Sequence, residues 1–466
     1  MQRLTISLVV ALVLTGCWAF PTGIYDSVTS LDSLDSFESA TGLESDAGGA
    51  TDGSEPTSEG GTEETGVVEC VPTELPEAAP GYSPMALASG PDGTLYVGGW
   101  TVAGAAELPG CDPVSPGAFI AAFAPNGTCA EIWGLPGGGG EIWDIAVQGG
   151  QVAAVGGIAD SAYLAIFDGG FDKPLHVKPL AVGYKGTAIT GLGDDRWGVA
   201  GWCVTEGVDT AMYAEFTPGV DPSIVCHPIK NASQGWSVVT DLPAGAIYLA
   251  GIHTNAMGLT MGDDANDNHM WLKVIQLDPE IPLSQRAEAA EERLIAGGKS
   301  FRPRLALTDE RLFIADRTSS APPAFPPTEL TENCQGQVAW FAKQDVITGP
   351  GQALWFDPDD PYCTLTIDDI VADGDGVLIA GHTPRSFEDS NKKDHLLQGL
   401  SDSFAARIDG AGPDLTYNPL PLSEVLVGGK TQIVRQCGDI VIATYLSTLP
   451  TDPPSGYTMN FATSPL

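Results

Sequence analysis

Positive charge is scarce in this sequence of 466 residues, which has 21 Lys and Arg residues against 60 Asp and Glu residues and a formal net charge of −39. A field of that sign repels nucleic acid and anionic lipid surfaces, and it disfavours both as partners. No segment reaches the roughly 18 consecutive apolar residues that a transmembrane helix needs. Helical periodicity is confined to residues 283–294, which predicts at most one modest helical insertion in an otherwise β-rich chain.

Several catalytic and metal-binding motifs are also missing. The chain has no Gly-x-Ser-x-Gly elbow, no His-Glu-x-x-His pair and no Cys-x-x-Cys spacing, so the usual sequence signs of a serine hydrolase, a zinc protease or a structural zinc site are absent. Two stretches end like a phosphate-binding loop, residues 298–300 and 429–431. The glycine expected five residues earlier is replaced by Arg293 and Glu424, and we therefore interpret both stretches as turns.

The first 17 residues have the layout of an export signal. Arg3 precedes the apolar run 4–14, and small residues follow up to Cys17. The segment Leu-Thr-Gly-Cys at 14–17 resembles the bacterial lipobox, which implies that Cys17 receives a diacylglycerol and becomes the mature N-terminus. An ordinary secretory signal with a nearby cysteine is the alternative. Trp18 is not Asp, and by resemblance to proteobacterial lipoproteins this favours the outer membrane of the cell envelope.

Residues 18–66 contain eleven acidic residues and no Lys or Arg, and they are rich in Ser, Thr and Gly. Such a composition buries too little apolar surface to offset the entropy of ordering, so we expect a disordered acidic linker. The predicted organisation is a signal peptide at 1–16, a lipidated cysteine and linker at 17–66, and one folded domain at 67–466. With 49 of the 60 acidic and 20 of the 21 basic residues, that domain carries a net charge of about −29.

An internal repeat defines the folded domain. A strand-like segment with small residues recurs seven times, at 93–100, 151–158, 195–202, 245–252, 310–317, 376–383 and 438–445. A second strand-like segment follows each one, at 118–127, 162–170, 211–219, 269–279, 337–345, 403–410 and 457–465. Further apolar segments flank several units, for example 141–147, 236–242 and 365–372. Four short strands in each of seven units predict an all-β fold, a seven-bladed β-propeller.

The repeat units also resemble the bacterial β-propeller repeat family, best at residues 94–99 with 118–123. This resemblance implies an architecture and no reaction. The last unit ends one strand short, and residues 67–71 precede the first unit, so we expect those residues to complete the last blade and close the ring. A pair of β-sandwiches is the structural alternative, because sandwiches and propellers share strand patterns.

The nine cysteines support an extracytoplasmic domain, since eight remain once Cys17 is assigned to lipid. Their positions within the units predict one disulfide inside each of blades one, three and five, and elimination leaves one that joins the first strand to the last blade. The predicted pairs are Cys111 with Cys129, Cys203 with Cys226, Cys334 with Cys363, and Cys70 with Cys437.

Few residues stand out as ligand-binding candidates. Asp264, Asn266 and Asn268 alternate as in the start of a calcium loop, but the following Gly and the later Glu are absent, so calcium is a weak candidate and no other cofactor is predicted. We interpret His253 and His382 as loop histidines. Among the aromatic residues, Trp100, Trp202 and Trp236 fit either the core between blades or a loop-lined binding surface.

These patterns favour a membrane-anchored binding or interaction scaffold whose partner is a protein, a glycan or a small molecule. One rival is a propeller enzyme of lyase or hydrolase type, with His, Asp, Glu or Arg side chains that converge in the central channel. Another is a structural subunit of an envelope assembly.

Overall fold

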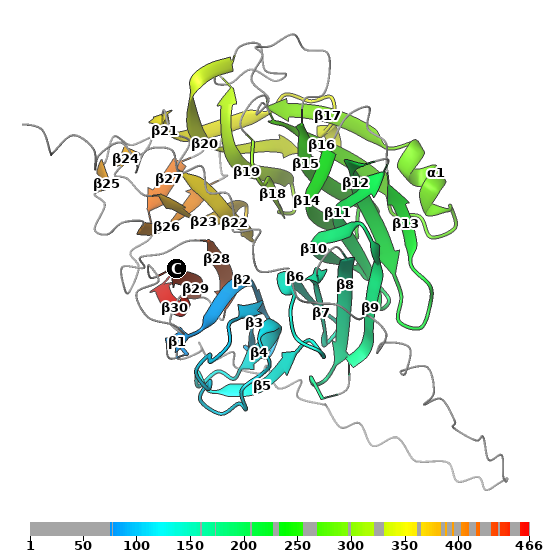
Figure 1. Cartoon of the computed structure of the whole chain (residues 1–466). Helices are drawn as coiled ribbons and strands as arrows, with labels where there is room; N and C mark the ends of the chain where they lie inside the picture. The colour runs from blue at the N-terminus through cyan, green and yellow to red at the C-terminus, as the bar shows by residue number, and fades with distance from the viewer. Residues whose placement is uncertain are drawn as a thin grey trace, which may run out of the picture. The chain divides into compact units, whose positions relative to one another are not determined.

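The computed structural model describes residues 75–76, 78–158, 161–172, 174–205, 207–226, 233–254, 268–296, 300–320, 330–360, 365–383, 387–388, 394–395, 402–409, 416–419, 430–436, 439–447 and 457–465. Within them, seven antiparallel four-stranded sheets surround a central axis (Figure 1). The innermost strands of neighbouring sheets contact one another in a closed ring. The predicted seven-bladed β-propeller is confirmed, and the sandwich alternative is excluded.

Each blade runs from an innermost to an outermost strand. Blade 1 consists of β2 (Tyr82–Ser89), β3 (Leu95–Thr101), β4 (Gly117–Phe123) and β5 (Cys129–Gly134), and blade 2 of β6 (Glu141–Gln148), β7 (Gln151–Ile158), β8 (Ser161–Asp168) and β9 (Pro174–Val182). Blade 3 consists of β10 (Tyr184–Gly193), β11 (Arg196–Thr205), β12 (Val208–Phe216) and β13 (Ser223–Cys226), and blade 4 of β14 (Ser233–Asp241), β15 (Ala246–Thr254), β16 (Asn268–Gln276) and β17 (Glu291–Ala296).

Blade 5 consists of β18 (Arg304–Leu307), β19 (Arg311–Ser320), β20 (Leu330–Ala342) and β21 (Gln352–Asp360). Blade 6 consists of β22 (Thr366–Asp373), β23 (Gly376–Thr383), β26 (Asp402–Asp409) and β27 (Thr416–Pro419). Blade 7 consists of β28 (Thr431–Gln436), β29 (Asp439–Ser447), β30 (Tyr457–Pro465) and β1 (Ala79–Pro80). A small ladder, β24 (Phe387–Glu388) with β25 (Asp394–His395), lies between β23 and β26 in the sequence. The helical elements are α1 (Leu283–Glu288) and a 3-10 turn, η3 (Lys343–Asp345).

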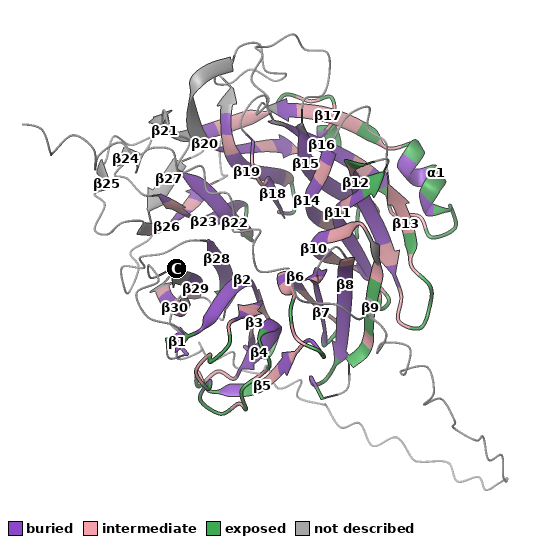
Figure 2. Ribbon diagram, viewed as in Figure 1, coloured by how far each residue is buried: buried purple, intermediate pink, exposed green. Residues whose placement is uncertain are grey.

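The core of the propeller lies between blades. Seven clusters of buried apolar side chains each join two neighbouring blades, from the pair of blades 7 and 1 round to the pair of blades 6 and 7. Because both faces of a blade pack against neighbours, the middle strands are apolar at nearly every position, and β4 is buried along its whole length (Figure 2). The repeated apolar runs of the sequence are therefore the interiors of the blades.

An N-terminal strand closes the ring. The strand β1 pairs with β30, through Ala79 with Met459 and Pro80 with Thr458, and it supplies the fourth strand of blade 7. The expectation that an N-terminal strand completes the last blade is confirmed by β1, whereas residues 67–71, to which we assigned that strand, lie outside the described residues. Proline fits this position because β1 is an edge strand.

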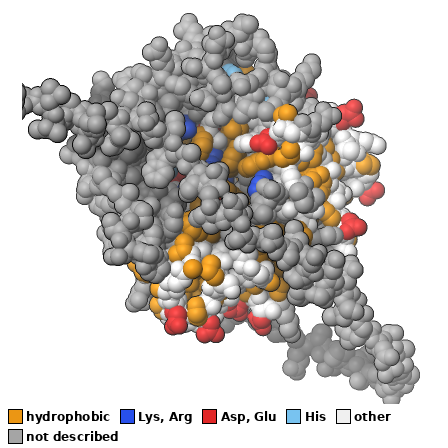
Figure 3. Space-filling view, viewed as in Figure 1, with side chains coloured by type: hydrophobic (Ala, Val, Ile, Leu, Met, Phe, Trp, Pro, Cys, Tyr) orange, Lys and Arg blue, Asp and Glu red, His pale blue; other side chains and the backbone are white. Residues whose placement is uncertain are grey.

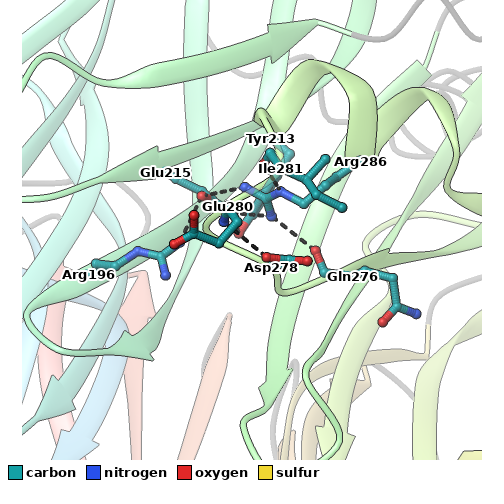
Figure 4. A network of polar contacts seen from close by, with 8 residues as sticks. All are labelled: Arg196, Tyr213, Glu215, Gln276, Asp278, Glu280, Ile281 and Arg286. Carbon is teal, nitrogen blue, oxygen red and sulfur yellow. Dashed lines mark hydrogen bonds and ion pairs between the residues drawn. The ribbon is translucent and has the colours of Figure 1, made fainter.

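The predicted helical insertion is only half correct. Helix α1 ends at Glu288, and residues Glu291–Ala296 form β17, the outer strand of blade 4. A buried ion cluster holds α1 in place (Figure 4). The guanidinium of Arg286 donates to both carboxylate oxygens of Glu215, over 2.9 and 2.8 Å, and to the backbone carbonyls of Ile281 and Gln276. Glu215 lies on β12, so this cluster fastens the helix to blade 3.

Two of the predicted disulfides are present. Cys111 is bonded to Cys129 in blade 1, and Cys203 to Cys226 in blade 3. The other two predicted pairs, Cys334 with Cys363 and Cys70 with Cys437, lie outside the part of the chain whose side chains are described, as does Cys17. Among the described residues, no helix is long and apolar enough to cross a membrane.

Candidate functional site

The repeated glycine of the sequence pattern has a structural role next to the axis. In five blades a glycine of the second strand lies opposite the start of the innermost strand, where a Cβ would overlap a backbone carbonyl of that strand; these are Gly99, Gly156, Gly201, Gly251 and Gly381. At the same places the innermost strand carries an irregular register with one extra residue, namely Met85, Trp143, Thr187, Trp236 and Asp368. Such bulges redirect a side chain.

Two of these bulge residues meet across the axis. The rings of Trp143 in blade 2 and Trp236 in blade 4 lie edge to face with centroids 6.3 Å apart, and Trp202 of blade 3 lies 5.2 Å from Trp236. Trp236 is 6% exposed, whereas Trp143 and Trp202 are half-buried. The three indoles therefore form an aromatic wall at the start of the innermost strands, and a binding surface at Trp202 and Trp236 stays a prediction.

Arg302, from the segment before β18, lies against this wall. Its guanidinium carbon is 5.2 Å from the ring centre of Trp143, 5.0 Å from that of Trp236 and 4.6 Å from that of Phe301. The ammonium of Lys430, from blade 7, is 5.7 Å from the ring centre of Trp143 and donates to the carbonyl of Met85 in blade 1. Side chains from blades 2, 4, 5 and 7 thus converge on the axis, and these ranges favour cation–π attraction.

Blade 5 departs from the glycine pattern in a way that explains the position of Arg302. Asp316 occupies the place that glycine has in those five blades, and its buried carboxylate accepts hydrogen bonds from the hydroxyl of Ser300 and from the backbone N–H groups of Phe301 and Arg302. Burial raises the pKa of Asp316, while these hydrogen bonds and Arg317 oppose that rise. Asp316 therefore fixes the backbone that presents Arg302 to the axis.

A second layer of charged groups lies one step further along the innermost strands. Arg304, which is 8% exposed, donates to the backbone carbonyls of Asp368 in blade 6 and Trp236 in blade 4. Asp144 accepts from the N–H groups of Ile145 and Ile189, which ties blade 2 to blade 3. In the same way, Asp369 accepts from the N–H groups of Ile370 and Ile433, and this ties blade 6 to blade 7.

The ionisable groups of the axis have displaced pKa values. Burial raises the pKa of Asp369 to about 6, although the positive charge of Arg304 opposes the rise. Burial, together with the positive charges of Arg304 and Arg302, lowers the pKa of Lys430 to about 7. Burial also raises the pKa values of Asp144 and Glu141. Groups that change protonation near neutral pH are enriched at functional sites, which makes the axis the candidate site.

The two singled-out histidines lie in strands, and the interpretation as loop residues is wrong. His253 belongs to β15, is fully buried, and its Nε2 lies 3.0 Å from a carboxylate oxygen of Glu292. His382 belongs to β23 beside the axis, where its Nδ1 lies 2.5 Å from Asp368 Oδ2. The same oxygen accepts from the N–H of Thr431 in blade 7. His382 therefore forms a His–Asp pair on the wall of the candidate site.

Four long connectors, at residues 101–117, 253–268, 318–336 and 384–402, begin at the same end of the propeller. Each follows the second strand of its blade, and in an antiparallel blade that end is also where the innermost strand begins. We call this side the loop face. It carries Trp100, Trp202 and His382, which directly follow the glycines opposite the bulges. Much of three connectors, including the calcium candidates Asp264 and Asn266, lies outside the described residues, as does the side chain of Asn268.

The described residues contain no group of three or more His, Cys, Asp or Glu side chains that could hold a metal ion. The sequence-based predictions missed these residues of the site: Trp143, Arg302, Arg304, Lys430, Asp144, Asp316, Asp368 and Asp369. One signal was available for the aspartates: Asp144 and Asp369 interrupt apolar runs that precede the recurring strand, and an acidic side chain within a buried strand needs a buried partner.

Comparison with known proteins identifies neither a family nor the site. No family model and no curated protein matches the chain. Among solved structures, the Dos1 propeller shares 10% identity at a TM-score of 0.44, over 85% of this chain and 95% of that one. The phage phi92 endosialidase shares 10% identity at a TM-score of 0.43, and the match covers 84% of this chain and 69% of that one. YjhT shares 10% identity at a TM-score of 0.37, and the match covers 76% of this chain and 99% of that one. Identities this low leave function to be argued from the site itself.

Proposed function

We propose that the chain is a ligand-binding propeller whose binding site is the loop-face mouth of the central axis. The observation that carries this proposal is the convergence of Trp143, Trp236, Arg302 and Lys430 from four blades onto one point. Pockets that bind small ligands combine aromatic walls with a few fixed polar groups, and this mouth has both. The long connectors on the same face add variable surface around a rigid scaffold.

The proposal includes the place where the protein works. We infer that acylation of Cys17 holds the propeller at the cell envelope, in the outer membrane, with residues 18–66 as a linker between lipid and domain. The support is the signal-like segment and the lipobox resemblance at residues 14–17. Attachment by two or more acyl chains is effectively permanent, whereas a single chain binds membranes marginally.

The test uses ligand screening by thermal shift, with each variant compared to its own ligand-free melting temperature. Compounds that stabilise the wild type are assayed against Trp202→Ala, at the mouth, and against Arg435→Gln, at the other end of an innermost strand. Arg435 is 48% exposed and pairs with Asp373, so its loss should leave the mouth unchanged. We expect Trp202→Ala to abolish or reduce the shift and Arg435→Gln to retain it. The reverse pattern would place binding elsewhere and overturn the proposal.

A second function, catalysis at the same mouth, is favoured by the His382–Asp368 pair. A carboxylate on Nδ1 fixes the imidazole tautomer and leaves Nε2 as a general base, the arrangement used in many proton-transfer sites. The His382 side chain is 24% exposed. Mass spectrometry of bound ligands after incubation tests this function. If the protein is an enzyme, His382→Asn should stop product formation while binding persists; an unchanged ligand with the wild type argues for binding alone.

A further inference from the structure

A groove lies where blades 4 and 5 meet, on the face opposite the loop face. It has a volume of about 740 Å³. Its floor is formed by the start of β15 and the end of β16, helix α1 forms one wall, and η3 with the residues after it forms the other. Ligand pockets in proteins have volumes of roughly 300 to 1,000 Å³, so the groove is large enough to hold a ligand.

Two insertions build this groove. The connector between the third and the outermost strand of a blade is short in blades 1, 2, 3 and 6, at residues 124–128, 169–173, 217–222 and 410–415. In blades 4 and 5 the same connector is longer, at residues 277–290 and 343–351, and it carries α1 and η3, respectively. The two longest connectors of this kind therefore belong to neighbouring blades and line the same groove.

Both walls of the groove are held by guanidinium groups of blade 4. Arg286 fastens α1 to the carboxylate of Glu215, as Figure 4 shows. Arg293 of β17 donates to the backbone carbonyls of Val346 and Gly349, over 2.9 and 2.7 Å, and fixes the loop that follows η3. Because both walls are in place before a ligand arrives, little conformational entropy remains to be lost on binding.

Tyr248 brings an unpaired hydroxyl to the floor of the groove. The residue is 3% exposed, and its hydroxyl has no hydrogen-bond partner among the described residues. Burial and the negative charge of Asp241 raise the pKa of Tyr248, which keeps the hydroxyl protonated. Since buried hydroxyls are nearly always hydrogen-bonded, the partner has to come from what occupies the groove. The side-chain amides of Gln276, Gln285 and Gln344 around the groove are likewise unpaired within the described part of the chain.

The free charge of the groove is negative. Of the two basic side chains that line it, Arg286 is held in its buried ion cluster and Lys343 pairs with the buried Asp241. The carboxylates of Glu291 and Asp345 also line the groove, and neither has an ion-pair partner among the described residues. Acidic side chains of the described residues also gather at the outer edge of the face seen in Figure 3. The charges left uncompensated therefore favour a cationic ligand.

A peptide with a basic side chain matches each of these features. The cationic head of lysine or arginine suits the free carboxylates, and the aliphatic stem suits the apolar floor at Ala246, Val274 and Val346. Main-chain amides both donate and accept, as the glutamine amides do. We propose that this groove binds an extended segment of a partner protein through a basic side chain, with Glu291 and Asp345 as the residues that bind its cationic head. The site is separate from the mouth and does not depend on the proposed function.

The test selects ligands for the full-length protein, in mild detergent at physiological salt, from randomised heptapeptides displayed on phage. An acidic protein attracts basic peptides over its whole surface, so the double variant Glu291→Gln with Asp345→Asn is compared with the charge-matched control Glu280→Gln with Glu288→Gln. Glu280 and Glu288 are exposed at the two ends of α1 and do not line the groove. Wild type and control should enrich a shared motif with a basic residue, and the groove variant should not. Equal enrichment by the groove variant, or no enrichment by the wild type, overturns the inference.

A recovered peptide then separates charge from fit. Replacement of its basic residue by norleucine, which keeps the aliphatic stem, should raise the Kd about tenfold in fluorescence anisotropy, because hydrogen bonds to charged groups are the stronger ones. Ala289→Trp should block the groove without a change of charge and abolish binding, whereas Trp202→Ala, at the mouth, should leave it unchanged. Circular dichroism confirms folding of each variant.

Two results would contradict the assignment of the groove to a protein segment. Binding that persists in Ala289→Trp, or that is lost in Trp202→Ala, would place the peptide outside the groove. Displacement of the peptide by an equal concentration of cadaverine would make the groove a site for small amines. Neither result bears on the ligands of the mouth, so the proposed function stands or falls by its own test.

Discussion

At the scale of single residues, the contact between Arg286 and Glu215 is the strongest candidate for a large contribution to stability. The Arg286 side chain is 3% exposed and that of Glu215 10% exposed, and the pair forms two short hydrogen bonds (Figure 4). Loss of Arg286 removes both of these hydrogen bonds and leaves Glu215 with only the more exposed Arg196 as a counter-charge, which costs up to about 3 to 5 kcal/mol. We therefore expect Arg286→Met to lower the free energy of unfolding by about that amount in urea denaturation.

Arg196 provides the matched control for this prediction. It donates to the same carboxylate over 3.0 Å, but its side chain is 21% exposed. With Arg286 still in place, Glu215 keeps a counter-charge, so Arg196→Met should cost about 1 kcal/mol or less. Similar losses for the two variants would show that α1 is not fastened by this ion pair.

The axial Lys430 should give the protein a pH-dependent stability. Its pKa is about 7 in the folded protein against 10.5 without the fold. Between those values the unfolded chain binds the additional proton, so the free energy of unfolding should rise with pH, by up to about 1.4 kcal/mol per pH unit. Urea denaturation between pH 7 and 10 measures this slope. Lys430→Met should flatten it, and parallel curves for the two proteins would contradict the prediction.

Asp369 should give the free energy of unfolding a pH dependence of the opposite sign, at acidic pH. Its folded pKa of about 6 lies above the ordinary value of 3.8, so the folded protein binds more protons between these values and stability should fall as pH rises through them. Asp369→Asn should remove this fall when unfolding is measured between pH 4 and pH 6. Ile370 and Ile433 donate to different oxygens of Asp369, and the single amide oxygen of Asn keeps an acceptor for one of the two, so the variant should still fold.

At the scale of elements, the two described disulfides fasten outer strands: Cys111–Cys129 joins the β3–β4 connector to β5, and Cys203–Cys226 joins the second strand β11 to β13. Cys111 and Cys129 are separated by 18 residues, and Cys203 and Cys226 by 23. Loops of this size predict a stabilisation of about 3 kcal/mol for each bond through restriction of the unfolded chain. The double variants Cys111→Ser with Cys129→Ser, and Cys203→Ser with Cys226→Ser, should each lose about that amount in urea denaturation. Unchanged unfolding midpoints would contradict the prediction.

Strands and their order could be predicted from sequence because burial on both faces leaves an unmistakable apolar signal. The errors occurred where that signal is weak. Strand β1 has two residues, too short for any periodicity, and β17 was mistaken for helix because Glu291–Ala296 lies at an exposed outer edge. The axial site could not be predicted, since its residues come from separate blades and depend on the bulges. Only the pairing register between the innermost and second strands shows that Trp143 in blade 2 and Trp236 in blade 4 are equivalent bulge residues.

At the scale of the whole molecule, the charge distribution links the fold to its anchor. Residues 18–66 are acidic without a single basic residue, and residues 67–466 also carry a large negative net charge. Repulsion from an anionic membrane surface would hold such a chain away from the lipid, so the proposed attachment would have to come from acyl chains on Cys17. The mouth would then remain accessible to ligands in the surrounding solution.

Replacement of the anchor residue tests this picture directly. When expressed in a bacterium, the wild-type protein should fractionate with membranes and partition into detergent, and its intact mass should include acyl chains on Cys17. Cys17→Ser should remove the lipid and, once the signal segment is cleaved, release the propeller in soluble form, because no helix among the described residues is long and apolar enough to cross a membrane. Its melting temperature should equal that of the wild type, since residues 18–66 separate Cys17 from the blades in the sequence. A wild-type mass without lipid, or a variant that stays with the membrane, would show that Cys17 is not the anchor.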